Sequence, residues 1–361
     1  MAEEATTYDF LIVGAGIAGS TLALELHKKG KRIAIIDDNK EHSSSRTAAG
    51  MMNPMVPRNV QKAWKCDQIY PSVFEYYENW EHLFGAKFIH RIPTLQVHKN
   101  AQHTKNWTKR SKENGFQQHL TPVDADGLSL NTYGLPLPFG GAECLLSGKL
   151  DVKEFLEAAY TYFTQIGIDR IQAKFPHESL HFDGVWHVLN ISAEQIVFAE
   201  GIGLYENPYF NYLPLGATGG DILVLEIPDL PQDFILKRKE WLVPIGGNLW
   251  LGGSTYHNES LSTVPEAHHA AELIALFKEW IPQEIKMVSH RRAPRPTVAT
   301  WRPFLGKHPQ HDTLYIYNGL GSKGSSLVSY LSPRYANFLC EGIPLDPEVD
   351  ISRFEDSKNG L

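Results

Sequence analysis

The chain has 361 residues, of which 42% are hydrophobic and 21% charged, and its formal net charge is −7. This length suffices for two domains with a large core, and the composition is that of a globular protein. The acidic balance argues against a dedicated nucleic-acid-binding protein. The first ten residues, MAEEATTYDF, are too polar for a signal peptide, and no apolar stretch is long enough to span a membrane, so we expect a cytoplasmic protein.

The stretch from Tyr8 to Asp37 has the order of strand, glycine turn, helix and strand. In its G-x-G-x-x-G turn, Gly14 permits the tight bend, Gly16 lets a pyrophosphate approach the backbone, and Gly19 lets helix and strand pack closely. The helix N-terminus offers N–H donors to a diphosphate. The carboxylate of Asp37 is placed to bind the ribose hydroxyls of an adenosine and disfavours NADP. The motif does not decide between NAD and FAD.

Beyond this unit the chain leaves the nucleotide-binding pattern twice and returns. We expect amphipathic helices from Asp67 to Phe84 and from Leu150 to Gly167, and strands with turns at Gly219-Gly220 and Gly246-Gly247. The sequence therefore predicts an α/β fold with a discontinuous, Rossmann-like nucleotide-binding domain and a second, mainly antiparallel β-sheet domain. The first domain is expected to comprise residues 1–84, 138–212 and 296–361, and the second residues 85–137 and 213–295.

Two further segments are rich in small residues. The segment HSSSRTAAGMMNP from His42 fits an ordinary surface loop, a helix beginning near Ser43, or a stretch beside a large ligand. The segment GLGSKGSS, Gly319 to Ser326, follows a predicted strand and opens a helix, so its N–H groups can face an electron-rich group.

Three cysteines limit the redox and metal chemistry. Cys66, Cys144 and Cys340 lie far apart and form no C-x-x-C pair. This spacing predicts a reduced compartment, no structural zinc and no other metal site.

The chain resembles the flavin-dependent D-amino-acid oxidase superfamily, and within it the glycine oxidase and sarcosine oxidase types. The likeness rests on the opening fingerprint, SRTAAGMMNP, Arg295-Pro296 followed by PFLGKHP, GLGSKGSS, and WLVP from Trp241. Any one of these is weak, but together they are specific and extend over nearly the whole chain. The resemblance implies an FAD-binding domain of the GR2 type and a substrate domain. It also implies noncovalent FAD, because no family-type cysteine for covalent attachment stands in GLGSKGSS.

The resemblance also assigns cofactor contacts. The first glycine turn would hold the diphosphate, the SRTAAGM segment would line the flavin, Phe175 would reach the adenine region through its backbone, and GLGSKGSS would place amides near the flavin N1 and C2 oxygen. The residues expected to bind FAD are Gly14, Ala15, Gly16, Ile17, Ala18, Gly19, Asp37, Asp38, Ser45, Arg46, Thr47, Ala48, Gly50, Met51, Phe175, Gly201, Gly319, Gly321, Ser322, Lys323, Gly324 and Ser325.

Three residues are expected at the reacting end. In the resembling enzymes the arginine equivalent to Arg295 holds the substrate carboxylate, a bidentate pairing that fixes the amine carbon over the flavin; the alternative is a structural arginine at a domain hinge. Lys323 is either a cation near the flavin, acting on oxygen or the reduced flavin, or a solvated turn lysine. Trp241 replaces a smaller tyrosine-type residue of glycine oxidase, which puts glycine in doubt as the substrate.

The resemblance implies an FAD-dependent oxidoreductase that oxidises the C–N bond of a small carboxylated amine, either an amino acid or an N-substituted glycine. A hydride passes to flavin N5, water hydrolyses the imine, and oxygen or another acceptor takes the electrons. Two alternatives stay open: an oxidase that modifies the wobble uridine of tRNA, and an FAD-binding protein without catalysis. The expected partners are a small amine and an electron acceptor, with tRNA only under the first alternative.

Overall fold

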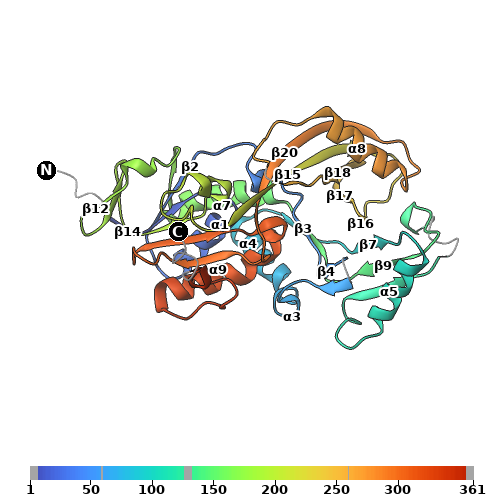
Figure 1. The fold of residues 1–361 in the computed structure, drawn as a ribbon, viewed down its shortest axis with the longest axis horizontal. Coiled ribbons are helices and arrows are strands. Elements are labelled where there is room, and N and C mark those ends of the chain that lie inside the picture. Colours follow the sequence, from blue (N-terminus) through green and yellow to red (C-terminus); the bar gives the residue numbers. More distant parts are fainter. Residues whose placement is uncertain (1–6, 58–59, 126–131, 259, 355–361) are drawn as a thin grey trace.

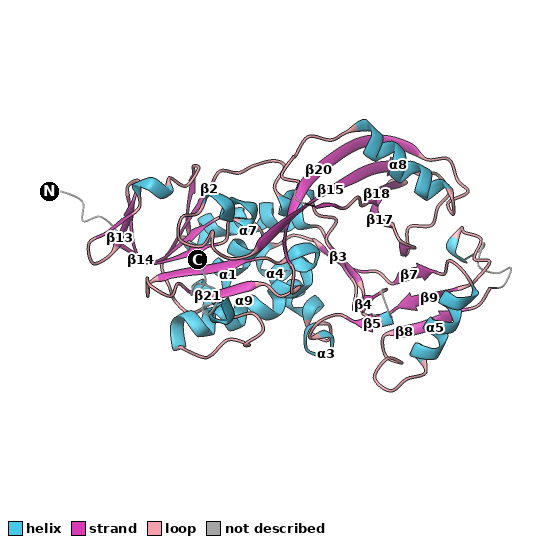
Figure 2. Cartoon of the chain, in the orientation of Figure 1, coloured by secondary structure: helices cyan, strands magenta, loops and turns pink. Residues whose placement is uncertain are grey.

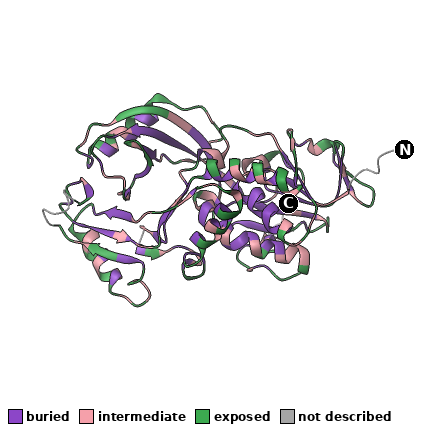
Figure 3. Ribbon diagram, turned by 180° about the vertical axis from the view of Figure 1, so that it is seen from behind, coloured by how far each residue is buried: buried purple, intermediate pink, exposed green. Residues whose placement is uncertain are grey.

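The computed structural model describes residues 7–57, 60–125, 132–258 and 260–354. Two large sheets organise these residues, a mainly parallel sheet at the left of Figure 1 and a mainly antiparallel sheet at the right. Helices pack on both, as Figure 2 shows, and the buried residues follow the sheets and the helix faces against them (Figure 3). This arrangement confirms the α/β fold with a Rossmann-like domain and a substrate domain.

The first sheet has the strand order β11-β2-β1-β14-β13-β12, and β14 also pairs with β22, which pairs with β21. Its parallel strands are apolar on both faces because both are covered: Phe10 and Ile12 pack on one side, Leu11 and Val13 on the other. The strands are β1 (Thr7–Val13), β2 (Ile33–Asp37), β11 (Asp169–Gln172), β12 (His181–Phe182), β13 (Trp186–Val188), β14 (Ile191–Phe198), β21 (Phe304–Lys307) and β22 (Leu314–Asn318).

Four helices accompany this sheet: α1 (Ile17–Lys28), α4 (Val73–Phe84), α7 (Val152–Ile166) and α9 (Gly324–Glu341). Helix α7 begins where the Asp151 side chain accepts a hydrogen bond from the Glu154 amide, and it ends at Gly167, whose φ is +75°. The helix expected from Asp67 to Phe84 is wrong as one element. It divides into α3 (Cys66–Ile69) and α4, because Pro71 has no N–H with which to continue the first helix.

The second sheet has the order β19-β15-β18-β17-β16-β7-β9-β8, and β20 pairs with β15. From β20 to β7 its strands follow an arc in Figure 1, and α8 (Ala267–Lys278) packs on one face through Leu273 and Phe277. The strands are β7 (Thr94–Val97), β8 (Leu120–Val123), β9 (Gly141–Cys144), β15 (Leu215–Glu226), β16 (Ile235–Lys237), β17 (Trp241–Gly246), β18 (Leu249–Gly253), β19 (His257–Asn258) and β20 (Lys286–Val298).

Shorter elements lie between and beside the two sheets. They are α2 (Ser44–Thr47), β3 (Met51–Met52), β4 (Met55–Val56), β5 (Gln61–Lys62), β6 (Ile89–Arg91), α5 (Ala101–Ser111), β10 (Gly148–Leu150), and the 3₁₀ turns η3 (Gly201–Glu206) and η4 (Gly321–Lys323). We propose the division into three and two segments stated above, with one boundary moved: β9 lies in the expected segment 138–212 but pairs with β7 and β8 of the second sheet. None of the helices in the described parts of the chain has the length and apolar character needed to cross a bilayer.

One of the two expected glycine turns is confirmed and the other is wrong. Gly246 and Gly247 have φ angles of +90° and +60° and form the turn between β17 and β18. Gly219 and Gly220 instead lie inside β15. A Cβ on Gly219 would stand 2.8 Å from Arg292 Nη2, so the glycine makes room for an arginine side chain on the neighbouring strand.

Candidate active site

The first glycine turn closes tightly on β14 and on α1. Gly14 has φ +101°, and a Cβ there would lie 2.5 Å from the Ala199 carbonyl oxygen; a Cβ on Gly19 would lie 1.9 Å from the Gly14 carbonyl oxygen. The N-cap residue of α1 is Gly16, which has no side chain with which to cap the helix. The Ile17 N–H donates to Ser45 Oγ at 3.1 Å. The helix N-terminus therefore keeps backbone donors for an anionic group such as a diphosphate.

Asp37 lies beside this turn. Its carboxylate accepts hydrogen bonds from the Ala15 and Asn39 amides, each at 2.7 Å, and Arg46 Nη2 donates to Asn39 Oδ1 at 2.8 Å. These contacts bring Asp37 and Arg46 to one end of the glycine turn, where the adenosine ribose was expected. Asp38 turns to Lys40, with 2.7 Å between Asp38 Oδ2 and the Lys40 ammonium.

The SRTAAGM segment lies between the two sheets. Of the three readings that the sequence left open, a helix does begin there: Ser43 Oγ accepts from the Arg46 amide and α2 follows. A Cβ on Gly50, with φ +64°, would lie 1.8 Å from the Leu150 carbonyl oxygen, so the backbone passes directly against β10. The side chain of Met51 then packs against a cluster on the second sheet that includes Trp241.

The GLGSKGSS segment brings a second helix N-terminus to the first. Neither η4 nor α9 has a side-chain cap, and a Cβ on Gly324 would lie 3.4 Å from Ile17 Cγ2. Two adjacent helix N-termini that lack side-chain caps, with glycines that allow close approach, fit the diphosphate and flavin of FAD. Three other expected contacts follow the carboxyl ends of first-sheet strands, where nucleotides bind in such folds: Phe175 after β11, Gly201 after β14 and Gly319 after β22.

Arg295 lies on β20 with its guanidinium across Gly220 of β15, where a Cβ would stand 2.0 Å from Nη2. Nη2 donates to Ser254 Oγ at 2.7 Å, and the guanidinium carbon lies 5.0 Å from the ring of the exposed Tyr256. Within the described residues no carboxylate forms an ion pair with Arg295. Sequence reasoning missed Ser254, which no motif marks.

Arg292 has the structural role that was the alternative for Arg295. It lies on the opposite face of the same strand and is 2% exposed, and its Nη1 is 2.5 Å from Asp221 Oδ2. Burial raises the pKa of Asp221. Hydrogen bonds from Thr255 and His290 and the charge of Arg292 lower it by more than burial raises it, so the net pKa lies below the usual value. The carboxylate that could neutralise Arg295 is thus occupied by Arg292.

Lys323 extends into the protein from the start of α9. Its Nζ donates to the Asn53 carbonyl oxygen at 3.2 Å. Burial, followed by the charge of Lys237, lowers the pKa of Lys323 to about 8, and Cys66 opposes the shift. This ammonium is therefore not a solvated turn lysine.

Trp241 is 8% exposed and lies on the same face of the second sheet as Arg295. A Cβ on Gly253 of the paired strand would stand 2.6 Å from Trp241 Cζ2, so the indole crosses that glycine. Ile222, which is two residues from Gly220 on β15, packs in the same cluster as the indole. This face, which Met51 contacts from the first domain, therefore holds Arg295 and Trp241 together.

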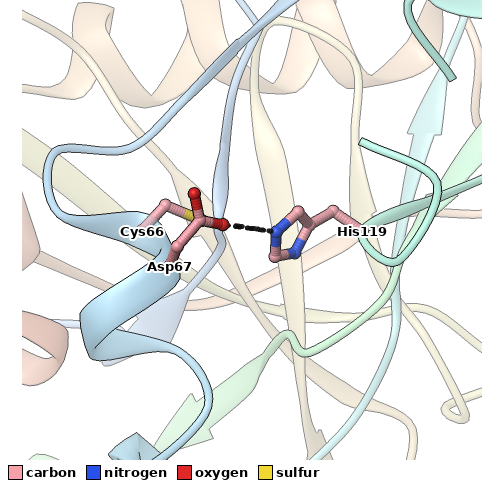
Figure 4. Close-up of side chains that lie close together, drawn as sticks. All are labelled: Cys66, Asp67 and His119. Atoms are coloured by element: carbon pink, nitrogen blue, oxygen red, sulfur yellow. Dashed lines mark hydrogen bonds and ion pairs between the residues drawn. The ribbon is translucent and has the colours of Figure 1, made fainter. Parts of the chain in front are cut away.

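Cys66, Asp67 and His119 lie close together, with the Asp67 carboxylate pointing at the imidazole (Figure 4). His119 Nε2 is 3.2 Å from Asp67 Oδ1 and 3.9 Å from Cys66 Sγ. Lys62 Nζ lies 2.7 Å from both Asp67 oxygens, and burial raises the pKa of the Cys66 thiol to about 11. An ion pair and a protonated thiol account for this cluster, and we assign no metal to it.

The sequence matches the family described as DAO, FAD dependent oxidoreductase, over residues 9–331. It is 22% identical over 386 residues to the uncharacterized oxidoreductase YurR of Bacillus subtilis (strain 168), covering 96% of this chain and 98% of that protein. It is 23% identical to the tRNA 5-methylaminomethyl-2-thiouridine biosynthesis bifunctional protein MnmC of Idiomarina loihiensis, covering 96% of this chain but only 59% of that protein.

The fold is similar to that of glycine oxidase from Geobacillus kaustophilus, with a TM-score of 0.80 at 19% identity and with 96% of this chain and 98% of that chain covered. At this identity the likeness concerns the fold. The family match covers nearly the whole length, including both helix N-termini of the proposed cofactor site. The chain therefore belongs to the DAO family of FAD-dependent oxidoreductases.

Proposed function

We propose that this flavoprotein oxidises the C–N bond of a small carboxylated amine, an amino acid or an N-substituted glycine. The observation that carries the proposal is the half-buried guanidinium of Arg295, which has no carboxylate partner in the described part of the chain and lies on the face that Met51 contacts. A cation removed from water is costly unless an anion compensates it, and a substrate carboxylate fits a guanidinium bidentately. The likeness to glycine oxidase supports the same substrate class.

We propose that the chain holds FAD noncovalently. The turn at Gly14 and the α1 N-terminus would hold the diphosphate, Asp37 the ribose, and the α9 N-terminus the flavin. Bound FAD supplies the hydride acceptor of the reaction. The chain need only bind and orient the substrate, and we assign no general base.

Arg295 would fix the substrate carboxylate, and thereby place the carbon next to the amine nitrogen. Ser254 holds one guanidinium nitrogen, so the orientation of the clamp is set before the substrate arrives. The indole of Trp241 fills the same face and would exclude water from the reacting carbon. Lys323 would add positive charge at the other side of the substrate, and the product imine is hydrolysed by water.

A second candidate, an oxidase acting on tRNA, is favoured by the likeness to MnmC. The structure offers it no basic surface at Lys237–Lys239: the Arg238 guanidinium is 3.2 Å from Glu279 and the Lys239 ammonium 3.8 Å from Glu240. We therefore favour the small amine, and keep a cytoplasmic location as a prediction.

The proposal is tested by mixing the holoenzyme anaerobically with glycine, sarcosine, D-amino acids, imino acids and bulk tRNA, and recording loss of flavin absorbance. We expect a carboxylated amine to reduce the flavin. Arg295→Gln should weaken its binding by about 30-fold or more, because the partner charge is lost. Arg302→Gln, which removes an arginine already paired with Glu348, is the matched control.

Unchanged affinity in Arg295→Gln would exclude the carboxylate clamp. Reduction by tRNA alone would establish the second candidate, and a flavin that no amine reduces would favour a protein without catalysis. A purified protein that takes up no FAD would contradict the flavin assignment itself.

A further inference from the structure

Lys237 is a third cation at this site, after Arg295 and Lys323. It lies on the same sheet face as Arg295 and Trp241. Lys237, the last residue of β16, is directly paired with Trp241 of β17 and with Gln96 of β7. Paired residues of neighbouring strands point to one side, and Ile235, two residues earlier, packs in the cluster that Met51 contacts. The half-buried Lys237 side chain therefore points to the face of the sheet that carries Arg295 and Trp241.

The ammonium of Lys237 has neither a hydrogen bond nor an ion pair with any residue that the structure describes. The titratable groups near enough to affect its charge are the Cys144 thiol, Glu240 and Lys323. Burial lowers the pKa of Lys237, and Lys237 in turn lowers that of Lys323. Two ammonium groups that disfavour each other are stabilised by an anion between them or beside one of them.

Unsatisfied polar atoms surround the same place. Thr94, paired with Ile235, and Gln96 are both fully buried, and neither the Thr94 hydroxyl nor Gln96 Oε1 has a hydrogen-bond partner in the structure. Buried polar atoms in folded proteins are nearly always paired, and an unpaired one is explained by an unseen water, ion or ligand. A hydroxyl and an ammonium are both donors to an anion, and Gln96 Oε1 can accept from the ammonium.

We propose that Lys237, together with the Thr94 hydroxyl, binds a second carboxylate of the substrate, so that the amine oxidised here is a dicarboxylate. The inference rests on the proposed function, with Arg295 holding the first carboxylate. The Arg295 guanidinium lies over strand β15, and Lys237 lies on β16. These two strands are three interstrand steps apart, roughly 14 Å. The two carboxylates should therefore be separated by several bonds.

Binding of diacids that have no amine to the holoenzyme tests this without turnover. Isothermal titration with malonate, succinate, glutarate and adipate, and with butyrate as the one-carboxylate control, should show that the longer diacids bind about 10- to 100-fold more tightly than butyrate. Lys237→Met should remove this advantage and leave butyrate unchanged, while Lys237→Arg should restore it. Lys239→Met, an exposed neighbour, should change neither.

Thr94→Val is the second variant; it keeps the side-chain shape and should reduce the diacid advantage without affecting butyrate. Diacids that bind the wild type no more tightly than butyrate would overturn the proposal, as would a Lys237→Met variant that weakens diacids and butyrate equally. A preserved diacid advantage, in an enzyme whose flavin no carboxylated amine reduces, would contradict the proposed function but support the subsite.

Discussion

Gly220 and Arg295 lie so close that a methyl group on the glycine would stand 2.0 Å from the guanidinium nitrogen Nη2. Gly220→Ala therefore should displace Arg295 without removing it. We expect weaker binding of carboxylates, measured by titration of the holoenzyme with butyrate. Gly216→Ala on the same strand, where the nearest atom is the movable Thr297 hydroxyl at 3.1 Å, should bind as the wild type does. Equal affinity in both variants would mean that the position of Arg295 is unimportant for binding.

Arg292 and Arg295 should differ in their effects on stability. Arg292→Leu leaves the fully buried Asp221 without its guanidinium partner, and we expect the free energy of unfolding to fall by about 3–5 kcal/mol. Arg295→Leu removes a cation without an ion-pair partner in the described structure and should cost far less. Urea unfolding of the two holoenzyme variants measures the difference; equal losses would contradict the separate roles.

The charge of Lys323 should make carboxylate binding depend on pH. With a pKa of about 8, its ammonium is charged below pH 8 and favours an anion, so affinity for acetate should fall as pH rises through this value. Because acetate has no amine that titrates, the pH dependence of its binding near pH 8 reports on Lys323. Lys323→Met should bind acetate less tightly at pH 7 and lose the step near pH 8. A step that persists in this variant would belong to another group.

Removing the Asp37 carboxylate should weaken FAD binding. Asp37→Ala loses the acceptors for the Ala15 and Asn39 amides as well as the proposed ribose contact, and a charged hydrogen bond is worth about 1.5–3 kcal/mol. We expect at least a tenfold higher Kd for FAD, measured by quenching of flavin fluorescence. Asp37→Asn keeps one acceptor and should lie between this variant and the wild type. An unchanged Kd in Asp37→Ala would exclude the ribose contact.

The parts of the fold that depend on residues close together in the sequence were predictable. The strand, turn and helix around Gly14 follow from local glycine chemistry and apolar pattern, and the structure has them with β2 ending at Asp37. Gly219 and Gly220 were misassigned because the reason for them lies on another strand, in Arg292 and Arg295. A glycine that makes room for a distant side chain looks locally the same as a turn glycine.

The site was predictable where a motif marks it and not elsewhere. Arg295 stands in a recognisable pattern, whereas Lys237 lies in a polar, basic stretch that suggests a solvated turn. Only strand pairing shows that Lys237 and Trp241 point to one side of the sheet. The unpartnered hydroxyl of Thr94 has no sequence signature at all, because any strand threonine has the same local surroundings.

The contact between Ile17 and Gly324 also has a consequence for how the protein is made. The two helix N-termini proposed to hold FAD meet across nearly the whole length of the chain. A chain still on the ribosome cannot complete this site until residue 324 has emerged, so full cofactor binding follows the emergence of α9. Bound FAD would then join α1 and α9, and protease resistance of α9 should rise with cofactor occupancy.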